Sequence, residues 1–373
     1  MKIALVSAYD YAFPGAVTDH VRNLAAQFDA RGHSVRVIAP CSDPALVPDE
    51  RFVPMGRPIP IPSGGSVARV SLSVWLAPRT KSLLREESFD VVHLHEPFSG
   101  VLPFTVLGLS DAANIATFHS YRGTRLWTRG TTRLARPYFR KLHGRIAVSE
   151  PARDFISGHF PGSYEIIPNG VRVAAYANGG VPFPHLCDGM VNILFVGRLE
   201  KRKGLSHLLG AFAKLKWTWP NIRLLVVGPG PPDEDSYRTL SERNIKDVVF
   251  VGAVSEEDKI RYYKTADIFC TPATGRESFG VVLLEAMAAG NPIVATAIEG
   301  YSKVITHGSE GLLVPPESED GLAHAIETLL RDPQLARRLA YNGLARAREF
   351  SWETIGRRVE EFYTSRLQAR AGR

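Results

Sequence analysis

The sequence has few cysteines, and their number and spacing exclude two kinds of site. Cys41, Cys187 and Cys270 are the only three in 373 residues, and they lie far apart. An odd, scattered set forms neither a paired disulfide framework nor a zinc site of the usual cysteine spacing. This usage is typical of a reducing compartment, so we expect a cytoplasmic protein without a metal site.

Long apolar runs are also missing. No window approaches the ~18 consecutive apolar residues that a spanning helix needs, and the run 1–6 is too short for a signal peptide because Asp10 follows closely. The GxGxxG fingerprint of nicotinamide-binding domains does not occur. There are no internal repeats or low-complexity tails. We therefore expect a globular protein with neither a spanning segment nor a nicotinamide cofactor.

The composition is that of an ordinary globular protein, with 45% hydrophobic and 22% charged residues. A chain of 373 residues exceeds what one hydrophobic core usually covers, which predicts two domains. The net charge of +7 is uneven: residues 1–180 hold 20 Lys and Arg against 14 Asp and Glu, whereas residues 181–373 hold 25 against 24. Any anionic surface should therefore meet the N-terminal half. We expect no nucleic-acid partner.

The chain opens with a strand–helix–strand pattern. Residues 2–8 are a continuous apolar run typical of a buried parallel strand, residues 17–30 carry apolar side chains at helical spacing, and residues 34–39 form the next strand. This predicts the start of a Rossmann-like domain. Gly15 and Ala16, in the intervening turn, place open backbone where a diphosphate could bind. A plain tight turn explains them equally well.

Further strands predict two α/β domains, 1–173 and 190–352, each a parallel sheet with helices. We expect residues 59–70, rich in Pro and Gly, to be an irregular loop and residues 174–189 to be a linker. Asp233-Glu234-Asp235 has the spacing of a metal-binding DxD motif, but no strand places it, and we interpret it as an exposed loop.

Two histidines end predicted strands of the first domain. His95 follows the strand 89–94, and His119 follows the strand 115–118. Ligand sites of α/β proteins form at the carboxyl ends of parallel strands. A lone histidine is more often structural, but this position favours a functional role.

A basic loop follows the first strand of the second domain. Four cations, at 198, 201, 202 and 203, lie between Gly197 and Gly204. Cations at a strand's end are suited to a diphosphate; the alternative is a loop of solvated charges.

The stretch 275–296 organises the second half. Good helix formers at 281–289 are ended by Gly290, and 293–296 is typical of a buried strand. The free N–H groups of the helix N-terminus favour a phosphate. Glu277 precedes the helix, and Glu285 lies within its apolar run, so the two carboxylates would bind hydroxyls on either side of that phosphate. Two solvated surface glutamates are the alternative.

One segment of the first domain is strongly basic. Residues 112–149 contain eight Lys and Arg and no acid, and six arginines are spaced three or four apart, which would line one helix face. A second basic helix is predicted at 77–87. We expect these surfaces to dock on anionic lipid; a solvated basic face is the alternative. The residues concerned are Arg79, Lys81, Arg85, Arg122, Arg125, Arg129 and Arg133.

The stretch 275–296 resembles the donor-site motif of the retaining GT-B glycosyltransferases of family 4, which have a Glu, seven residues and a second Glu between SFG and a PIVAT-like strand. Within that family the chain is most similar to bacterial phosphatidylinositol α-mannosyltransferases. The motifs shared with them are PGAVTDHV at 14–21, GSVAR at 65–69, HLHEP at 93–97, ATFHS at 116–120, GRIAVS at 144–149 and IPNGV at 167–171.

The resemblance implies a GT-B fold, in which two Rossmann-like domains face each other across a cleft and the C-terminal helix, here 353–373, joins the first. It also implies the roles of the site residues. Arg198 and Lys203 would bind the donor diphosphate, Glu285 the ribose, and Glu277 the sugar, which His119 contacts from the opposite domain. The remaining donor-site residues are Gly15, Ala16, Ser278, Phe279, Gly280 and Val281.

The resemblance also suggests how the base is recognised. In these mannosyltransferases an acidic residue two places after the position of Val254 meets guanine, and here that residue is Glu256, with Lys259 beside it. A carboxylate accepts from the two adjacent guanine donors, whereas uracil has one donor and a repelling carbonyl. A helix-capping acidic turn is the alternative.

The expected reaction moves mannose from GDP-mannose to a membrane lipid such as phosphatidylinositol, at the cytoplasmic membrane face, without a metal or other cofactor. Retention proceeds through either a protein nucleophile or attack on the same face. Three departures from the family concern the acceptor side: Ala16, Thr18 and Ser63-Gly64. The alternatives are transfer from another nucleotide sugar to diacylglycerol or to a soluble acceptor, and a non-catalytic nucleotide-sugar-binding protein. The acceptor-binding candidates are Tyr9, Thr18, Ser66 and Arg69.

Overall fold

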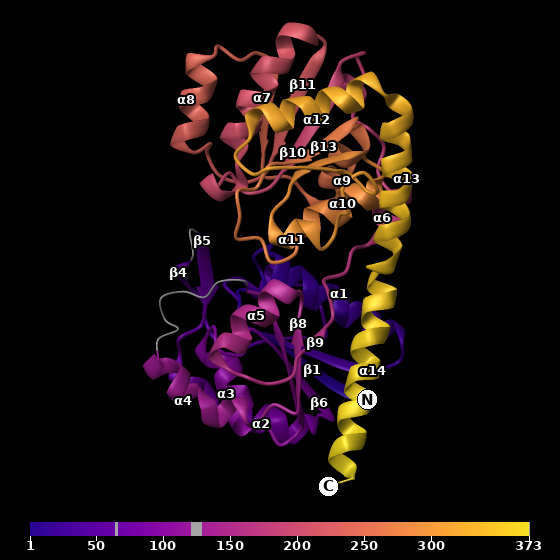
Figure 1. Ribbon diagram of the computed structural model, residues 1–373. Coiled ribbons are helices and arrows are strands. Elements are labelled where there is room, and N and C mark those ends of the chain that lie inside the picture. Colours follow the sequence, from indigo (N-terminus) through magenta and orange to yellow (C-terminus); the bar gives the residue numbers. More distant parts are fainter. Residues whose placement is uncertain (64–65, 121–128, 373) are drawn as a thin grey trace. The chain divides into compact units, whose positions relative to one another are not determined.

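The computed structural model describes residues 1–63, 66–120 and 129–372, with the side chains of 62, 63, 66 and 129–131 excepted. Contacts divide the chain into two compact units. Unit 1 comprises residues 1–169 and 352–373, and unit 2 comprises residues 170–351. Each unit is built around a parallel sheet with helices on both faces (Figure 1). The expected α/β class with two Rossmann-like domains is therefore confirmed.

The sheet of unit 1 has the strand order β3-β2-β1-β6-β7-β8-β9. Its order reverses at β1, which pairs in parallel with both β2 and β6. The strands are β1 (Lys2–Ser7), β2 (Ser34–Ala39), β3 (Phe52–Pro54), β6 (Val91–His95), β7 (Ala113–Phe118), β8 (Gly144–Ala147) and β9 (Glu165–Ile166). The helices are α1 (Ala16–Ala30), α2 (Ala77–Glu87), α3 (Val101–Leu109), α4 (Arg129–Phe139), α5 (Glu150–His159) and α14 (Trp352–Ala371), with short 3-10 turns at Pro44–Leu46 and Val74–Leu76.

Successive side chains of β1 point to opposite faces of this sheet, as strand geometry requires. Ile3 and Leu5 pack with buried residues of α1 and α14. Ala4 and Val6 pack on the other side, with α3, α4 and α5. Figure 1 shows α14, in yellow, returning to unit 1 at the C-terminal end of the chain.

Unit 2 repeats this design, with the strand order β12-β11-β10-β13-β14-β15. One face is covered by α6, α9 and α10, and the other by α7 and α12. The strands are β10 (Val191–Val196), β11 (Ile222–Val227), β12 (Val248–Gly252), β13 (Ile268–Thr271), β14 (Ile293–Thr296) and β15 (Leu312–Val314). The helices are α6 (Val173–Asn178), α7 (Leu205–Thr218), α8 (Glu234–Glu242), α9 (Glu256–Thr265), α10 (Val281–Ala289), α11 (Glu299–Ser302), α12 (Glu319–Arg331) and α13 (Pro333–Glu349), with 3-10 turns at Pro184–Leu186 and Lys201–Lys203.

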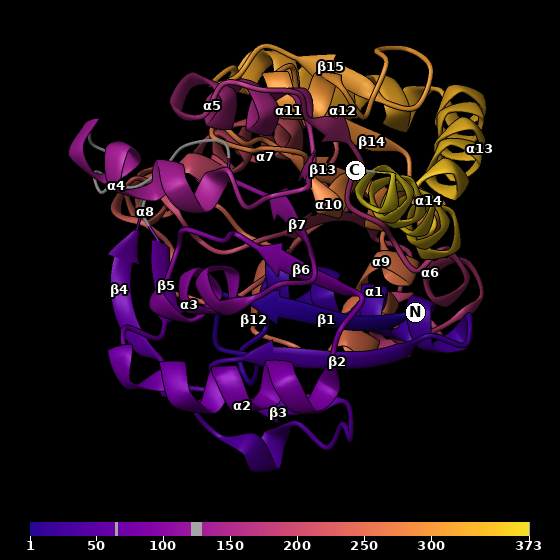
Figure 2. The same cartoon turned by 90° about the horizontal axis from the view of Figure 1, so that it is seen from below.

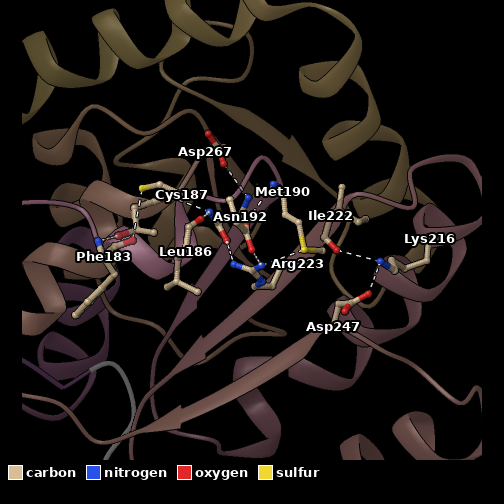
Figure 3. A network of polar contacts seen from close by, with 12 residues as sticks. Phe183, Leu186, Cys187, Met190, Asn192, Lys216, Ile222, Arg223, Asp247 and Asp267 are labelled. Carbon is tan, nitrogen blue, oxygen red and sulfur yellow. Dashed lines mark hydrogen bonds and ion pairs between the residues drawn. The ribbon is translucent and has the colours of Figure 1, made fainter.

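A polar network closes the amino-terminal edge of β10 and β11 (Figure 3). The guanidinium of Arg223, on β11, is buried and donates to Asn192 Oδ1 at 3.3 Å and to Asp188. Asp267 accepts the backbone N–H of Asn192 at 2.8 Å. These hydrogen bonds compensate for burying the Arg223 cation. Ligand sites of parallel sheets form at the opposite, carboxyl edge, so we interpret this network as structural.

Three expectations about loops are wrong. Residues 59–70 form a hairpin, with β4 (Ile59–Ser63) paired antiparallel to β5 (Ser66–Val70), seen in Figures 1 and 2. Pro60 and Pro62 are two residues apart in β4, so the positions of their missing N–H groups lie on the same side of the strand. That side is not paired with β5, and proline is tolerated on the unpaired side of an edge strand.

Residues 174–189 are not a linker, because they belong to unit 2, and Tyr176 of α6 is fully buried in its core. The chain passes between the units at 169/170 and 351/352. Asp233 does not lie in an open loop either. It caps α8, since its carboxylate accepts from the backbone N–H of Ser236.

Within the described part of the chain, no helix is long and apolar enough to cross a bilayer. Of the basic stripe, Arg122 and Arg125 lie outside the described residues. Arg129 begins α4, and Arg133 on the same helix is exposed.

Candidate functional site

The basic loop after β10 meets the loop before α10 at the carboxyl edge of the sheet of unit 2. The backbone N–H of Thr274 donates to the carbonyl of Arg202 at 2.9 Å. A Cβ at Gly204, where φ is +71°, would lie 2.1 Å from the carbonyl oxygen of Pro272. Only glycine permits this close approach. The two loops are therefore held together by backbone contacts, independently of the charged side chains they carry.

Glu277 is the centre of an ion-pair cluster between these loops. One carboxylate oxygen lies 2.6 Å from Lys203 Nζ and also accepts from Arg202 Nη1. Arg202 in turn donates to Glu200 at 2.8 Å. Burial raises the pKa of Glu277, but the two cations outweigh this and hold that pKa below its usual range. Glu277 is thus a fixed anion at neutral pH.

The backbone around Glu277 is itself constrained. Gly280, at φ +93°, is the N-cap of α10, and a Cβ there would lie 2.7 Å from the ring of Tyr301. Gly300 has no room either, because a Cβ would come within 2.2 Å of the carbonyl oxygen of Glu277. α10 therefore begins four residues after Glu277, whose carboxylate contacts Lys203 and Arg202. A helix N-terminus with cations nearby in this way is suited to a phosphate.

A second cluster lies one turn along α10. The Glu285 carboxylate is buried and accepts from Lys259 Nζ at 2.8 Å and from the Tyr263 hydroxyl at 3.0 Å. Glu285 lies four positions after Val281, about 6 Å along the helix axis. Glu277 thus precedes the N-terminus of α10, and Glu285 follows it.

Lys259 joins Glu285 to Glu256. Its ammonium lies 2.7 Å from Glu256 Oε2, while Glu256 Oε1 accepts from Arg172 at 2.7 Å and from the Tyr176 hydroxyl at 2.9 Å. Burial lowers the pKa of Lys259, but Glu285 and Glu256 outweigh it, so that its pKa is raised. The N-cap of α9 is Ser255, which accepts from the backbone N–H of Asp258. Glu256 therefore follows the cap.

In unit 1, the predicted residues gather at the carboxyl edge where β1, β6 and β7 end. Gly15 is the N-cap of α1, with room beside its Cα, and Ala16 begins the helix. Tyr9 bridges to Val70 next to the hairpin. The guanidinium of Arg69 stacks over the ring of Phe13, at 3.9 Å from its centroid.

Not every predicted residue points to open space. Thr18 is buried in α1. Ser66 is on β5, and its side chain is not among those that the structure describes. Arg198 is half exposed and lies 3.6 Å from Glu200.

His119 is held by two contacts from the strand beside it. Its Nε2 lies 3.1 Å from His95 Nδ1, and its backbone N–H donates to Glu96 Oε1 at 2.6 Å. The same oxygen accepts the backbone N–H of Ser120 at 2.8 Å. Burial, with smaller effects from His20 and His93, lowers the pKa of His119 well below its usual value. The ring is therefore neutral at pH 7 and has hydrogen-bonding capacity for a sugar hydroxyl.

Comparison with known proteins identifies the family. Residues 17–175 match the model described as Glycosyltransferase Family 4, and residues 188–346 match that described as Glycosyl transferases group 1. The chain is 35% identical over 364 residues to a phosphatidyl-myo-inositol mannosyltransferase of Mycolicibacterium smegmatis, covering 97% of this chain and 93% of that protein. It is 36% identical over 366 residues to its counterpart in Mycobacterium leprae, covering 97% and 96%. The chain belongs to this family of glycosyltransferases.

Solved structures confirm that the glycosyltransferase has the GT-B fold. Sucrose-phosphate synthase of Thermosynechococcus elongatus matches with a TM-score of 0.74 at 23% identity, covering 99% of this chain and all of that one. Anabaena Alr3699/HepE, solved in complex with UDP, matches with a TM-score of 0.78 at 20% identity, covering 98% and 100%. At these identities the likeness shows the fold alone.

Several residues of the glycosyltransferase site were missed by sequence reasoning. Arg202 was counted only as one of four cations, yet it contacts Glu277. Glu96, which holds the His119 loop, and Gly300, which makes room for the Glu277 backbone, were not singled out. Each acts on a partner 23 or more residues away in sequence. The local spacing gave no signal for these contacts, although the strand-end position of Glu96 could have pointed to it.

Proposed function

We propose that the protein transfers mannose from GDP-mannose to phosphatidylinositol, with retention, at the cytoplasmic face of the membrane. The main support is a sequence identity of 34–36%, along nearly the whole chain, to proteins named phosphatidyl-myo-inositol mannosyltransferase. The clusters described above support it, because they offer matching charges and helix dipoles for a nucleoside diphosphate sugar.

In the proposed mechanism the diphosphate is the leaving group. Arg198, Lys203 and the N-terminus of α10 stabilise the negative charge that develops as the glycosidic bond breaks. Arg202 and Lys203 keep Glu277 ionised and fixed, so that its carboxylate accepts from sugar hydroxyls. Glu285 accepts from the ribose hydroxyls. No step needs a metal ion.

A panel of acceptors tests the assignment against its alternatives. Purified protein would be incubated with GDP-mannose and UDP-sugars and with vesicles containing phosphatidylinositol, diacylglycerol or neither. We expect transfer to phosphatidylinositol. Transfer only to diacylglycerol or to a soluble sugar would support the second candidate, which the departures at Ala16 and Thr18 favour. A protein that neither transfers nor hydrolyses any donor would be a non-catalytic binder.

We predict that GDP binds more tightly than UDP and that Glu256 is responsible. In the structure the Glu256 carboxylate contacts Arg172, Tyr176 and Lys259. Guanine would therefore displace Arg172, which is half exposed, from this carboxylate. A carboxylate satisfies both guanine donors, and an amide satisfies them less well. Calorimetry of Glu256→Gln should show a smaller ratio of GDP to UDP affinity.

The matched control for this prediction is Glu257→Gln, since Glu257 is exposed in the same helical turn. It should leave the ratio unchanged. Tighter binding of UDP than GDP by the wild type, with Glu256→Gln neutral for GDP, would reject guanine recognition and leave Glu256 as part of an ionic network.

The proposed membrane contact lies on α2 and the turn before it. Leu72, Val74 and Trp75 expose 48, 68 and 86% of their surface. The exposed cations Arg79, Lys81 and Arg85 follow on α2. Exposed apolar side chains next to basic ones are typical of interfacial segments. Each basic residue near an anionic leaflet contributes about 1 kcal/mol, so a few suffice for reversible attachment.

We predict that changing Arg79, Lys81 and Arg85 to Glu strongly reduces sedimentation with anionic liposomes. Binding of the wild type should rise with anionic lipid and fall with salt. The matched control changes Arg337, Arg338 and Arg348, which are exposed on α13 of unit 2, to Glu. Equal losses in both variants would mean that only net charge matters. A variant that binds and transfers to lipid like the wild type would refute docking by α2.

A further inference from the structure

Three imidazoles come together at the carboxyl edge of the sheet of unit 1. His20 projects from α1, His95 ends β6, and His119 follows β7. One nitrogen of each ring can be chosen so that all three lie within 4.8 Å of one another. No other such group of three occurs among the described residues.

The nitrogens available to a ligand are His20 Nε2, His95 Nδ1 and His119 Nε2, and the last two contact each other. His20 Nδ1 lies 2.9 Å from Asn169 Oδ1, which can only accept, so Nδ1 carries the proton and Nε2 has a free lone pair. His95 Nδ1 and His119 Nε2 lie 3.1 Å apart and share one proton. When both bind a metal, each ring carries its proton on the other nitrogen, which for His95 is the buried Nε2.

A fourth histidine shows the contrast. His93 lies next to His95, with ring centroids 4.2 Å apart, but both its nitrogens are occupied. Nδ1 lies 2.5 Å from the Tyr363 hydroxyl, and Nε2 lies 2.7 Å from Thr117 Oγ1. Its role is structural. His95 Nδ1 and His119 Nε2, by contrast, contact each other.

We propose that His20, His95 and His119 bind a divalent transition-metal ion of the Zn²⁺ type, and that this ion excludes the sugar donor. Neutral imidazole is a ligand of choice for Zn²⁺, and three histidines with an open fourth position are a known coordination set. Zn–N bonds of 2.0–2.1 Å place tetrahedral nitrogens about 3.3 Å apart, so the rings need to close by roughly 1.5 Å or less. The hydrogen bond between His20 and Asn169 is of the kind that commonly orients a metal-bound histidine.

The exclusion of the donor rests on the proposed function, because it requires that His119 contact the sugar. The metal site itself does not depend on the proposed function. The ion is accordingly an inhibitor rather than a cofactor: a ring that donates its lone pair to a metal cannot also use that nitrogen for a sugar hydroxyl.

Cobalt titration tests the site directly. Co²⁺ replaces Zn²⁺ at histidine sites, and its visible absorption is intense when coordination is tetrahedral and weak when it is octahedral. The protein would carry no histidine tag and would have Cys187→Ser, since Cys187 is an exposed thiol. We expect intense bands that saturate at one equivalent.

Variants separate this site from adventitious binding. His119→Gln should abolish the bands, and Asn169→Ala, which keeps all three rings, should weaken binding by about tenfold or more. The control His324→Gln removes an exposed histidine of α12 and should change nothing. Thermal unfolding would verify that each variant is folded. A weak octahedral spectrum, or tetrahedral bands that persist in folded His119→Gln, would overturn the proposal.

Transfer kinetics complete the test. We expect Zn²⁺ to raise KM for the donor, with recovery on adding a chelator. If Co²⁺ binds as described but Zn²⁺ leaves KM unchanged, the metal site stands and the exclusion of the donor is overturned, together with the sugar contact of His119. If Co²⁺ does not bind, the metal site fails while the proposed function is unaffected.

Discussion

Replacing Glu277 by Gln should lower kcat for transfer by at least about a hundredfold, the effect typical of losing one preorganised electrostatic contact in an active site. The side chain keeps its size but loses the charge that Lys203 and Arg202 hold within the cluster. Lys203→Ala should have an effect of the same order, because it removes a cation from the leaving diphosphate and a partner from Glu277.

A matched control separates chemistry from the loss of an ion pair. Glu319, at the start of α12, also contacts two cations, Arg243 at 2.9 Å and Lys214 at 3.3 Å, but it lies outside the proposed site. Glu319→Gln should leave kcat unchanged. Steady-state kinetics would be compared for variants whose circular dichroism and thermal unfolding match the wild type. Wild-type turnover by a well-folded Glu277→Gln would overturn the site.

Removing α14 should unfold unit 1, although the helix is the last element of the chain. It contributes five side chains to the core that α1 and β1 share. At about 1.5–3 kcal/mol for each buried side chain, they supply roughly 8–15 kcal/mol, comparable with the whole stability of a domain. The side chains are Trp352, Ile355, Val359, Phe362 and Tyr363.

Hydrogen exchange would measure this effect element by element. A chain ending at Ser351 should lose protection in β1 and β6. A chain ending at Gln368, which removes the exposed residues 369–372 together with the last residue, should keep it. Phe362→Ala should cost about 3–5 kcal/mol. Full protection of β1 in the chain that ends at Ser351 would show that the contacts of α14 are dispensable.

Much of the fold could be predicted because local signals agree with tertiary structure. The helix 281–289 and the strand 293–296 were predicted with the bounds of α10 and β14, since Gly280 and Gly290 interrupt the chain at both ends. The helix 77–87 matches α2 for its whole length. The buried strand β1 was recognised from the continuous apolar run at residues 2–8.

The errors arise where tertiary context overrides composition. Glycine and proline predicted a loop at 59–70, but pairing with a second strand stabilises a hairpin whose prolines face away from that pairing. Small residues predicted a linker at 174–189, but Tyr176 packs into the core of unit 2.

The candidate site was predicted in its residues but not in its contacts. Glu277, Lys203 and Glu285 could be named from spacing and resemblance. The sequence could not show that Arg202 pairs with Glu277 or that Lys259 joins Glu285 to Glu256. These partners are set by how loops and helices meet in three dimensions. Sequence spacing fixes a residue's place along an element and not the neighbour that it contacts.

The central claim is tested most directly by mannosyl transfer from GDP-mannose to phosphatidylinositol vesicles, with the lipid product identified by mass spectrometry. We predict that phosphatidylinositol carrying one added hexose forms with the wild type, and that it is reduced at least about a hundredfold with Glu277→Gln and not with Glu319→Gln. No mannosylated phosphatidylinositol from a folded wild-type protein that does transfer to another acceptor would contradict the claim.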